Sequence, residues 1–404
     1  MTDSKNDLNM GCEEMRHKHI LCTYATRQID SNLFMSGTVF KGLNLCGYEV
    51  DMVFCGPNAV YETFRSRYAG CFGNIWHLSL PDSYIGRFCN AHVRLRLLYS
   101  FLRHFVLDVI WRPYSRRKLR HVLAKRNEYD CVLSFVPPYV SGRLGADVCS
   151  ICREKYQIEL IQFWTDPLSV GGISRVSDIP LRRMIHVYDE YRLLKVADKV
   201  VFNFPLLYDL ERELHPRFAH KMSWTDVGYV EHETDEYIPR NERITVGLFG
   251  AYQKKVRNIE PFLAAVKKLP NLKFVLRGDS DVVVNPASYP NLDVKSGRQP
   301  VSEIEALEAN CDILISLNAH SGMMPPGKTF YYASYAKPIV YIADGERQDY
   351  LMEYMEGLGR YVVCRNNVDS IVKGIKQAVA ILTGFQRNIP ERMRLDVIAR
   401  KIVG

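Results

Sequence analysis

The sequence predicts an α/β protein built of two Rossmann-like, doubly wound domains that face each other across a cleft. Its 404 residues are too many for one compact core, so at least two domains are expected. Short apolar runs alternate with helical patterns along both halves, which is typical of βαβ units around a parallel sheet. The segment 226–243 between the halves is polar and acidic and contains Pro239, as expected of a linker.

The first half shows this alternation from its first apolar run onward. Gly47 follows a helical pattern as a stop signal, and the next apolar run is a strand. The expected strands are 20–25, 49–55, 131–136, 158–164 and 199–204, and the expected helices are 37–46, 143–156 and 181–196.

The second half repeats the pattern more regularly. Ser302 followed by Glu305 forms a capping box, which predicts the start of one helix. Ligands of open parallel sheets bind beyond the carboxyl ends of the strands, so two facing sheets would both contact one ligand. The expected strands are 244–249, 273–277, 312–317, 338–343 and 360–364, and the expected helices are 259–269, 302–309, 328–335, 347–355 and 368–382.

We divide the chain into five segments on these patterns. They are a flexible tail at 1–18, an N-terminal domain at 19–225, the linker at 226–243, a C-terminal domain at 244–385 and a last helical segment at 386–404. A return of this last segment to the first half is one arrangement that the pattern allows.

The composition argues against a membrane-spanning or exported protein. The longest apolar stretch, 131–140, has ten residues and two prolines, whereas a membrane span needs about 18. Residues 1–19 lack the apolar core of a signal peptide, so we expect a cytoplasmic protein. Most of the eleven cysteines lie in apolar runs, and Cys149 and Cys152 have no second pair at zinc spacing. We therefore expect structural thiols and no metal.

A basic loop follows the first strand of the second half. Gly250 allows a ligand to approach the backbone, and Lys254, Lys255 and Arg257 place three cations before a helix. This arrangement suits a diphosphate, and a solvated basic turn is the alternative. The loop is neither a P-loop nor a G-x-G-x-x-G turn, which disfavours a triphosphatase or a plain dinucleotide site.

A second loop, 320–332, also follows an apolar strand and opens a helix. Backbone N–H groups at Ser321 and Gly322 are expected to face an anion, and Lys328 adds a full positive charge. Sugar hydroxyls would be bound by the next two hydroxyl side chains, Thr329 and Tyr331. The alternative is a tight Pro-Gly turn with packed tyrosines.

The segment 326–340, PGKTFYYASYAKPIV, resembles the donor-site helix of GT-B glycosyltransferases of the group 1, family 4-like kind. That family often reads P-x-K-x-F-E-Y-x-A-x-G-K-P-V-V. Further similar stretches are 246–252 with Arg257, 274–279, Gly297-Arg298 with Glu303, 311–315 and, in the first half, Ser36-Gly37 and 47–50. The resemblance is dense over about residues 244–343 and thin before them.

The resemblance implies a C-terminal domain that binds a nucleotide-diphosphate sugar and an N-terminal domain that binds the acceptor. It also implies retention of the anomeric configuration, and it adds Gly37, Asp279 and Arg298 to the expected donor site. No Asp-x-Asp pair lies at a plausible donor loop, since 279–281 follows another strand of the second half, so metal-independent transfer is expected.

The sequence departs from the family pattern at four positions. The family's paired glutamates fall on Met323 and Tyr331, the arginine after the first C-domain glycine on Ala251, and the glycine before Lys-Pro on Ala336. These departures favour a divergent branch that binds its donor differently, and weakened or lost donor binding is the alternative.

Asp166 is the expected catalytic residue of the first half. It follows strand 158–164 and precedes Pro167, so its carboxylate would orient the acceptor hydroxyl or serve as a base. An Asx turn before proline is the alternative. Trp164 would stack on a sugar face or belong to the core.

The tract 94–126 holds ten Lys and Arg residues against one acid, Asp108. Its apolar residues recur at helical spacing, which predicts an interfacial helix on an anionic membrane. The expected membrane-facing residues are Arg96, Arg103, Trp111, Arg116, Arg117 and Lys118. An ordinary helix with a solvated basic face is the alternative, and no nucleic-acid-binding module is recognised here.

Together these patterns predict a glycosyltransferase that moves a sugar from a nucleotide-diphosphate sugar to a glycan or lipid-linked glycan in surface polysaccharide biosynthesis. Cationic loops would stabilise the diphosphate leaving group, and no cofactor beyond the donor substrate and no nucleic-acid partner are expected. We expect the protein at the inner face of the membrane. The alternatives are a GT-B accessory protein without turnover, a basic nucleic-acid-binding protein and a nucleotide-sugar epimerase of the same fold.

Overall fold

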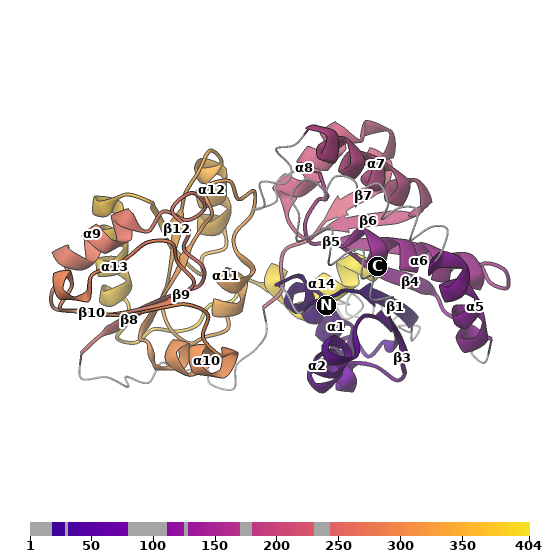
Figure 1. The fold of residues 1–404 in the computed structure, drawn as a ribbon, viewed down its shortest axis with the longest axis horizontal. Helices are drawn as coiled ribbons and strands as arrows, with labels where there is room; N and C mark the ends of the chain where they lie inside the picture. Colours follow the sequence, from indigo (N-terminus) through magenta and orange to yellow (C-terminus); the bar gives the residue numbers. More distant parts are fainter. Residues whose placement is uncertain (1–17, 29–30, 80–110, 125–127, 170–179, 230–242) are drawn as a thin grey trace, which may run out of the picture.

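The computed structural model describes residues 18–28, 31–79, 111–124, 128–169, 180–229 and 243–404. These residues form two α/β lobes (Figure 1), which confirms the expected fold class. None of the helices described combines the length and apolar character that crossing a membrane requires.

The described part of the N-terminal lobe is a seven-stranded parallel sheet flanked by helices. Its strand order is β3-β2-β1-β4-β5-β6-β7, as in a doubly wound sheet that grows outward from its first strand. The strands are β1 (His19–Ala25), β2 (Glu49–Cys55), β3 (Ile75–Leu78), β4 (Cys131–Val136), β5 (Glu159–Trp164), β6 (Lys199–Phe202) and β7 (Met222–Trp224). The helices are α1 (Ser31–Leu45), α2 (Asn58–Tyr68), α5 (Arg112–Leu123), α6 (Tyr139–Cys152), α7 (Pro180–Val196) and α8 (Pro205–Leu214).

The C-terminal lobe repeats this plan over its described residues with a six-stranded parallel sheet in the order β10-β9-β8-β11-β12-β13. The strands are β8 (Thr245–Phe249), β9 (Lys273–Gly278), β10 (Leu292–Ser296), β11 (Ile313–Leu317), β12 (Ile339–Ala343) and β13 (Val362–Arg365). The helices are α9 (Glu260–Lys268), α10 (Val301–Asn310), α11 (Gly327–Tyr332), α12 (Gln348–Gly357), α13 (Val368–Ala380) and α14 (Leu395–Val403).

Several expected boundaries differ from the structure. The sequence patterns did not predict β3, β7 and β10, which are short and half-exposed or lie at a sheet edge. The capping box was wrong, because α10 begins at Val301 after Pro300 and no side chain caps it. The helix expected at 37–46 begins at Ser31, which places Gly37 inside it.

The last helix of the chain belongs to the N-terminal lobe. Figure 1 shows α14 (yellow) beside α1 in the N-terminal lobe, near the middle of the molecule and apart from the C-terminal sheet. The contact is close, because a side chain on Gly42 of α1 would lie 2.3 Å from the carbonyl oxygen of Leu395. Ile398, Ala399 and Ile402 of α14 are buried in the same core as strands β1, β2 and β4.

The two lobes share a hydrophobic core. Trp164 and Phe204 of the N-terminal lobe lie in one buried cluster with Phe330, Tyr341 and other residues of the C-terminal lobe. The cluster therefore lies at the carboxyl ends of β5 and β6 and couples the first sheet to α11 and α12.

The segment expected to be a linker begins inside this shared core. Val227 and Tyr229 are buried, and the Asp226 side chain, also buried, accepts a hydrogen bond of 2.7 Å from the Tyr354 hydroxyl. Arg392 lies 3.5 Å from the same carboxylate. Residues 226–229 thus pack between the lobes, and 230–242 lie outside the described residues.

Candidate active site

Two loops at the carboxyl edge of the second sheet are pressed against each other. Gly250 and Gly278 have φ angles of 142° and 149°, which only glycine adopts without strain. A Cβ on Gly278 would lie 1.6 Å from the carbonyl oxygen of Gly250, so the backbones touch. The Tyr252 amide donates to the Asp279 carbonyl at 2.8 Å, and the Tyr252 hydroxyl donates to the Leu248 carbonyl at 2.7 Å. The basic loop is therefore held on the sheet.

The same loop is joined to the loops that follow β11, β12 and β13. The His320 amide donates to the Val256 carbonyl at 2.7 Å. The Asn366 side chain donates at 3.0 Å to both the Asn258 carbonyl and the Asp344 carboxylate. His320 Nδ1 lies 3.4 Å from the other oxygen of Asp344. Four loops thus form one connected surface at the carboxyl edge, where parallel sheets bind ligands.

Arg257 and Lys328 both contact the end of β8. The Arg257 guanidinium donates to the Ala251 carbonyl at 3.2 Å, and the Lys328 ammonium lies 5.6 Å from the centre of the Phe249 ring. Each cation therefore contacts a residue at or just after the end of β8, Arg257 through the Ala251 backbone and Lys328 through the Phe249 ring. A diphosphate site at this edge stays a prediction, and these two side chains are its candidate cations.

The two cations differ in how their charge is balanced. Lys328 forms an ion pair with Glu308, whose side chain is 1% exposed and also accepts a hydrogen bond of 2.9 Å from Tyr332. Arg257 has no acidic partner among the described residues, its Nε is buried without a hydrogen bond, and burial lowers its pKa. Glu308 was missed because a glutamate within an ordinary helical pattern predicts a solvated side chain.

The other basic residues of the loop are exposed. Lys254 pairs with Glu260 at 2.9 Å, and its amide donates to the Asp281 carboxylate at 2.8 Å. Lys255 is exposed and has no ionic partner within the part of the chain that the structure describes. Arg257 and Lys255 are thus the cations with charge available to an anion.

The remaining expected donor-site residues divide into two groups. Exposed at the carboxyl edge are Asp279, Arg298 and Ser321. Gly322 closes a turn by donating to the Ala319 carbonyl at 2.9 Å, and Tyr331 is half-buried with its hydroxyl 3.3 Å from that of Tyr335. Thr329, in contrast, is fully buried, and its hydroxyl lies 2.6 Å from that of Ser316 in β11. The Thr329 hydroxyl therefore faces the sheet and is not open to a sugar in this structure.

The structure corrects the expectation for Gly37, decides between the two alternatives for Trp164 and limits the role of helix α11. Gly37 lies inside α1 and not in a glycine-rich loop, and a Cβ there would meet the Tyr68 hydroxyl at 2.3 Å. Trp164 is fully buried and donates to Gln162 at 3.1 Å, so it belongs to the core and cannot stack on a sugar. Helix α11 has only six residues, which makes its N-terminal dipole a minor contribution to anion binding.

Asp166 lies half-buried in the loop that follows β5. The loop is fixed on both sides of it. Thr165 donates to the Asn32 side chain at 3.2 Å, and the amides of Leu168 and Ser169 donate to Glu190 at 2.7 Å each. Asp166 therefore has a defined place at the carboxyl edge of the first sheet, and its catalytic role remains a prediction.

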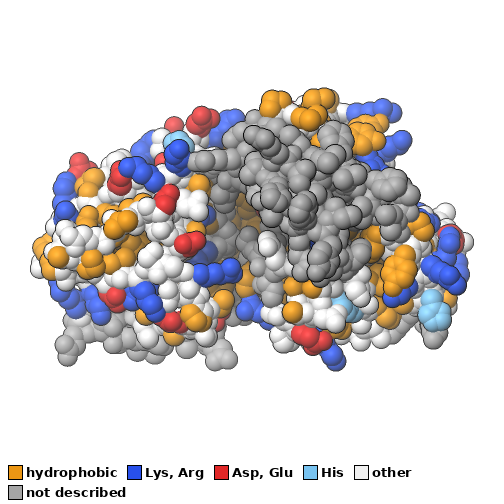
Figure 2. All heavy atoms as spheres, viewed as in Figure 1, with side chains coloured by type: hydrophobic (Ala, Val, Ile, Leu, Met, Phe, Trp, Pro, Cys, Tyr) orange, Lys and Arg blue, Asp and Glu red, His pale blue; other side chains and the backbone are white. Residues whose placement is uncertain are grey.

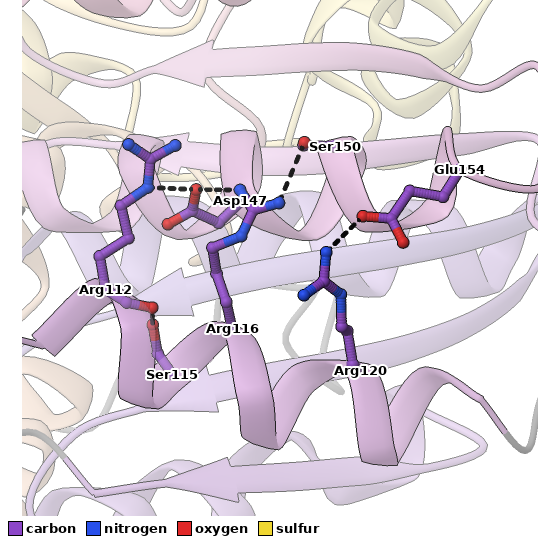
Figure 3. A network of polar contacts seen from close by, with 7 residues as sticks. All are labelled: Arg112, Ser115, Arg116, Arg120, Asp147, Ser150 and Glu154. Atoms are coloured by element: carbon purple, nitrogen blue, oxygen red, sulfur yellow. Dashed lines mark hydrogen bonds and ion pairs between the residues drawn. The ribbon is translucent and has the colours of Figure 1, made fainter.

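The basic tract packs as an ordinary helix where it is described. Arg96 and Arg103 lie outside the described residues, and Trp111 is 5% exposed in a core cluster, so it cannot contact a membrane. Figure 3 shows Arg112 and Arg116 of α5 directed at Asp147 of α6, at 2.9 and 3.1 Å. Arg117 and Lys118 are exposed. The buried side of α5 therefore packs as in an ordinary helix, and a membrane contact through Arg117 and Lys118 stays a prediction.

Comparisons with known proteins identify the fold. No protein-family model matches the sequence. No curated protein sequence matches it either. Solved structures match over nearly the whole chain.

Three of these structures illustrate the likeness. The apo form of the lipopolysaccharide outer core galactosyltransferase WaaB is 10% identical, with a TM-score of 0.55 over 96% of this chain and 99% of that one. UGT2 of Phytolacca americana, complexed with UDP-2-fluoro-glucose and pterostilbene, is 11% identical, with a TM-score of 0.54 over 96% and 98%. A protein of Listeria monocytogenes assigned as a UDP-N-acetylglucosamine 2-epimerase is 10% identical, with a TM-score of 0.52 over 96% and 95%. The chain thus has the GT-B fold.

Proposed function

We propose that the protein is a glycosyltransferase that uses a nucleotide-diphosphate sugar as its donor. The observation that carries the proposal is the connected loop surface of the C-terminal lobe, where Arg257 presents a cation without an acidic partner among the described residues. Structural neighbours that transfer sugars or bind UDP-sugars support it.

The proposed chemistry follows from the charges at this edge. As the glycosidic bond breaks, negative charge accumulates on the diphosphate, and Arg257 with Lys255 would stabilise it in place of a metal ion. Asp166 would orient the acceptor hydroxyl or take its proton from the facing sheet. The acceptor is a glycan or a lipid-linked glycan, and the configuration is retained.

We also propose a membrane-facing surface on α7, in addition to the tract 94–126, most of which lies outside the described residues. Leu181, Met184 and Tyr188 of α7 are 43%, 67% and 56% exposed, and Arg183 lies among them. Figure 2 shows hydrophobic side chains beside Lys and Arg at the top of the N-terminal lobe, where α7 lies in Figure 1. Apolar side chains next to cations suit an anionic lipid surface that carries the acceptor.

The donor site is tested by a binding screen of nucleotide diphosphates and their sugars. Arg257→Gln should weaken the best ligand by about 10-fold or more, because a charge-assisted contact contributes about 1.5–3 kcal/mol. Lys273→Gln is the matched control, because Lys273 is exposed at the first residue of β9, at the end of the sheet opposite to the carboxyl edge. Equal affinities of the two variants would remove Arg257 from the donor site.

An epimerase is the second candidate, because a protein assigned that activity shares the fold. The two reactions differ in their need for an acceptor. An epimerase converts the donor without any acceptor, whereas a transferase releases nucleoside diphosphate only slowly until the acceptor is added. An accessory protein without turnover would bind no nucleotide sugar in the same screen.

A further inference from the structure

Three metal-ligating side chains meet inside the N-terminal lobe, away from the donor loops. Glu190 lies on α7, while Glu211 lies on α8 and His215 directly follows that helix. Their side chains are almost fully buried, and one donor atom of each lies within 4.8 Å of the others. The spacing of four residues brings Glu211 and His215 to the same face of α8.

The hydrogen bonds of this cluster leave one carboxylate without donors. Glu190 Oε1 accepts the two amides of Leu168 and Ser169, and its Oε2 lies 3.3 Å from His215 Nε2. Glu211 Oε2 is 3.8 Å from the same nitrogen, and neither oxygen of Glu211 has a hydrogen-bond partner among the described residues. A buried carboxylate without donors or a cation is strongly unfavourable.

We propose that Glu190, Glu211 and His215 bind a divalent cation of the zinc class. Ligand atoms in a tetrahedral zinc site lie roughly 3.3 Å apart, since each bond is about 2.0–2.1 Å. The measured separations of 3.3 and 3.8 Å from His215 Nε2 are close to this value. Two carboxylates and a neutral imidazole also balance the charge of a divalent cation, and this nitrogen and oxygen donor set suits zinc.

A solvent-accessible groove reaches the cluster from outside. The groove has a volume of about 870 Å³, and Tyr191, Leu214 and His215 are among the residues that line it. It provides an entry path for the ion and room for a solvent molecule as the fourth ligand.

The position of the cluster assigns the cation a structural role. Through its other oxygen, Glu190 holds the loop that contains Asp166, so an ion on Glu190 would fix that loop against α7 and α8. The site uses no residue of the donor loops, so its Zn²⁺ affinity can be measured separately from donor binding. The absence of a zinc motif in the sequence is consistent with it, since Glu190 joins the other two ligands only through the fold.

The test uses the untagged full-length protein, stripped with a chelator and titrated with Zn²⁺ against a chromophoric competitor. We expect one Zn²⁺ per chain and a rise in melting temperature on its addition. Glu211→Gln and His215→Gln should weaken binding by at least about 10-fold and remove the thermal response, because each removes a ligand. Glu213→Gln and His220→Gln are matched controls, since both residues are exposed nearby.

Two outcomes overturn the proposal. Equal Zn²⁺ affinity in Glu211→Gln, His215→Gln and the controls would show that the ion binds elsewhere. The second outcome is that Zn²⁺ does not change the melting temperature of the wild-type protein and that Glu211→Gln melts at the same temperature as the wild type. This result would show that Glu211 is a protonated carboxyl group and that no cation is bound there. Far-UV circular dichroism of each variant confirms that it is folded before binding is compared.

Discussion

Lys328 shows how one neighbouring side chain changes the role that is assigned to a residue. The sequence alone makes it a phosphate-binding cation, but the structure pairs it with the buried Glu308. Its charge therefore stabilises the C-terminal lobe as well as adding to the field at the end of β8. Arg257, which lacks such a partner among the described residues, is the stronger candidate for donor binding.

Lys328→Ala should lower the free energy of unfolding by about 1–3 kcal/mol, because among the described residues it leaves the buried Glu308 carboxylate with the Tyr332 hydroxyl as its one side-chain donor. Urea denaturation measures this loss. Glu308→Gln in the Lys328→Ala background should restore part of it, since no uncompensated charge remains. Lys376→Ala is the control, because Lys376 is exposed on α13. Equal stability of Lys328→Ala and Lys376→Ala would contradict the role of the ion pair.

The strands were predicted well where a run of apolar residues is fully buried. β2 and β4 have the expected bounds, since every residue of β4 and all but the first of β2 is buried. β10 could not be predicted in the same way, because it lies at a sheet edge with mostly exposed side chains. The pattern of apolar residues along the sequence therefore predicts fully buried strands, but it does not predict strands with one face open to solvent.

The site was predicted less completely than the fold, for the same reason. Arg257 and Lys328 were found because they follow strands that a parallel sheet brings to one edge. Glu308 and the cluster around Glu211 were not found, because each depends on contacts between separate helices. The tract 94–126 predicted a membrane helix, and in α5, which belongs to this tract, Asp147 of α6 binds two of the arginines.

At the level of elements, α7 and α5 make competing predictions for membrane association. Met184→Gln combined with Tyr188→Gln should weaken sedimentation with anionic vesicles, because it removes exposed apolar surface from α7. Arg117→Gln combined with Lys118→Gln changes exposed positions of α5 and should have a smaller effect. A larger loss of sedimentation in the α5 double variant would favour α5 as the membrane-facing helix. Unchanged sedimentation of both double variants would reject membrane binding through either helix.

The Tyr354 hydroxyl adds a buried polar contact to the hydrophobic core that the lobes share. It donates to the buried Asp226 at 2.7 Å, its ring lies 4.6 Å from that of Phe204, and burial together with the Asp226 charge raises its pKa. Tyr354→Phe should cost about 1–3 kcal/mol and increase the radius of gyration in small-angle scattering, because the carboxylate loses its closest donor. Tyr350→Phe, on the same helix and packed on the same Phe204, is the control. A compact and equally stable Tyr354→Phe protein would show that the hydroxyl does not hold the lobes.

The whole molecule should lose stability in alkaline solution. Burial raises the pKa of Cys131, Cys149 and Cys364 from 9.0 to about 12, and that of Tyr68 from 10.0 to about 12. Above about pH 9 the unfolded thiols lose protons that the folded state keeps, so the folded state binds more protons and its stability falls as pH rises. The urea midpoint under reducing conditions should therefore decrease between about pH 8 and about pH 10. A constant midpoint over this interval would contradict the raised pKa values.

The return of α14 to the N-terminal lobe has a mechanical consequence. The chain passes between the lobes twice, and the Tyr229 amide, where the described part of the first passage ends, lies 3.4 Å from the Met393 carbonyl of the second. We expect two connections to restrict the relative rotation of the lobes more than one connection would. They also mean that a fragment ending at residue 229 lacks the helix that covers α1, so proteolytic separation of the lobes should expose apolar surface on the N-terminal fragment.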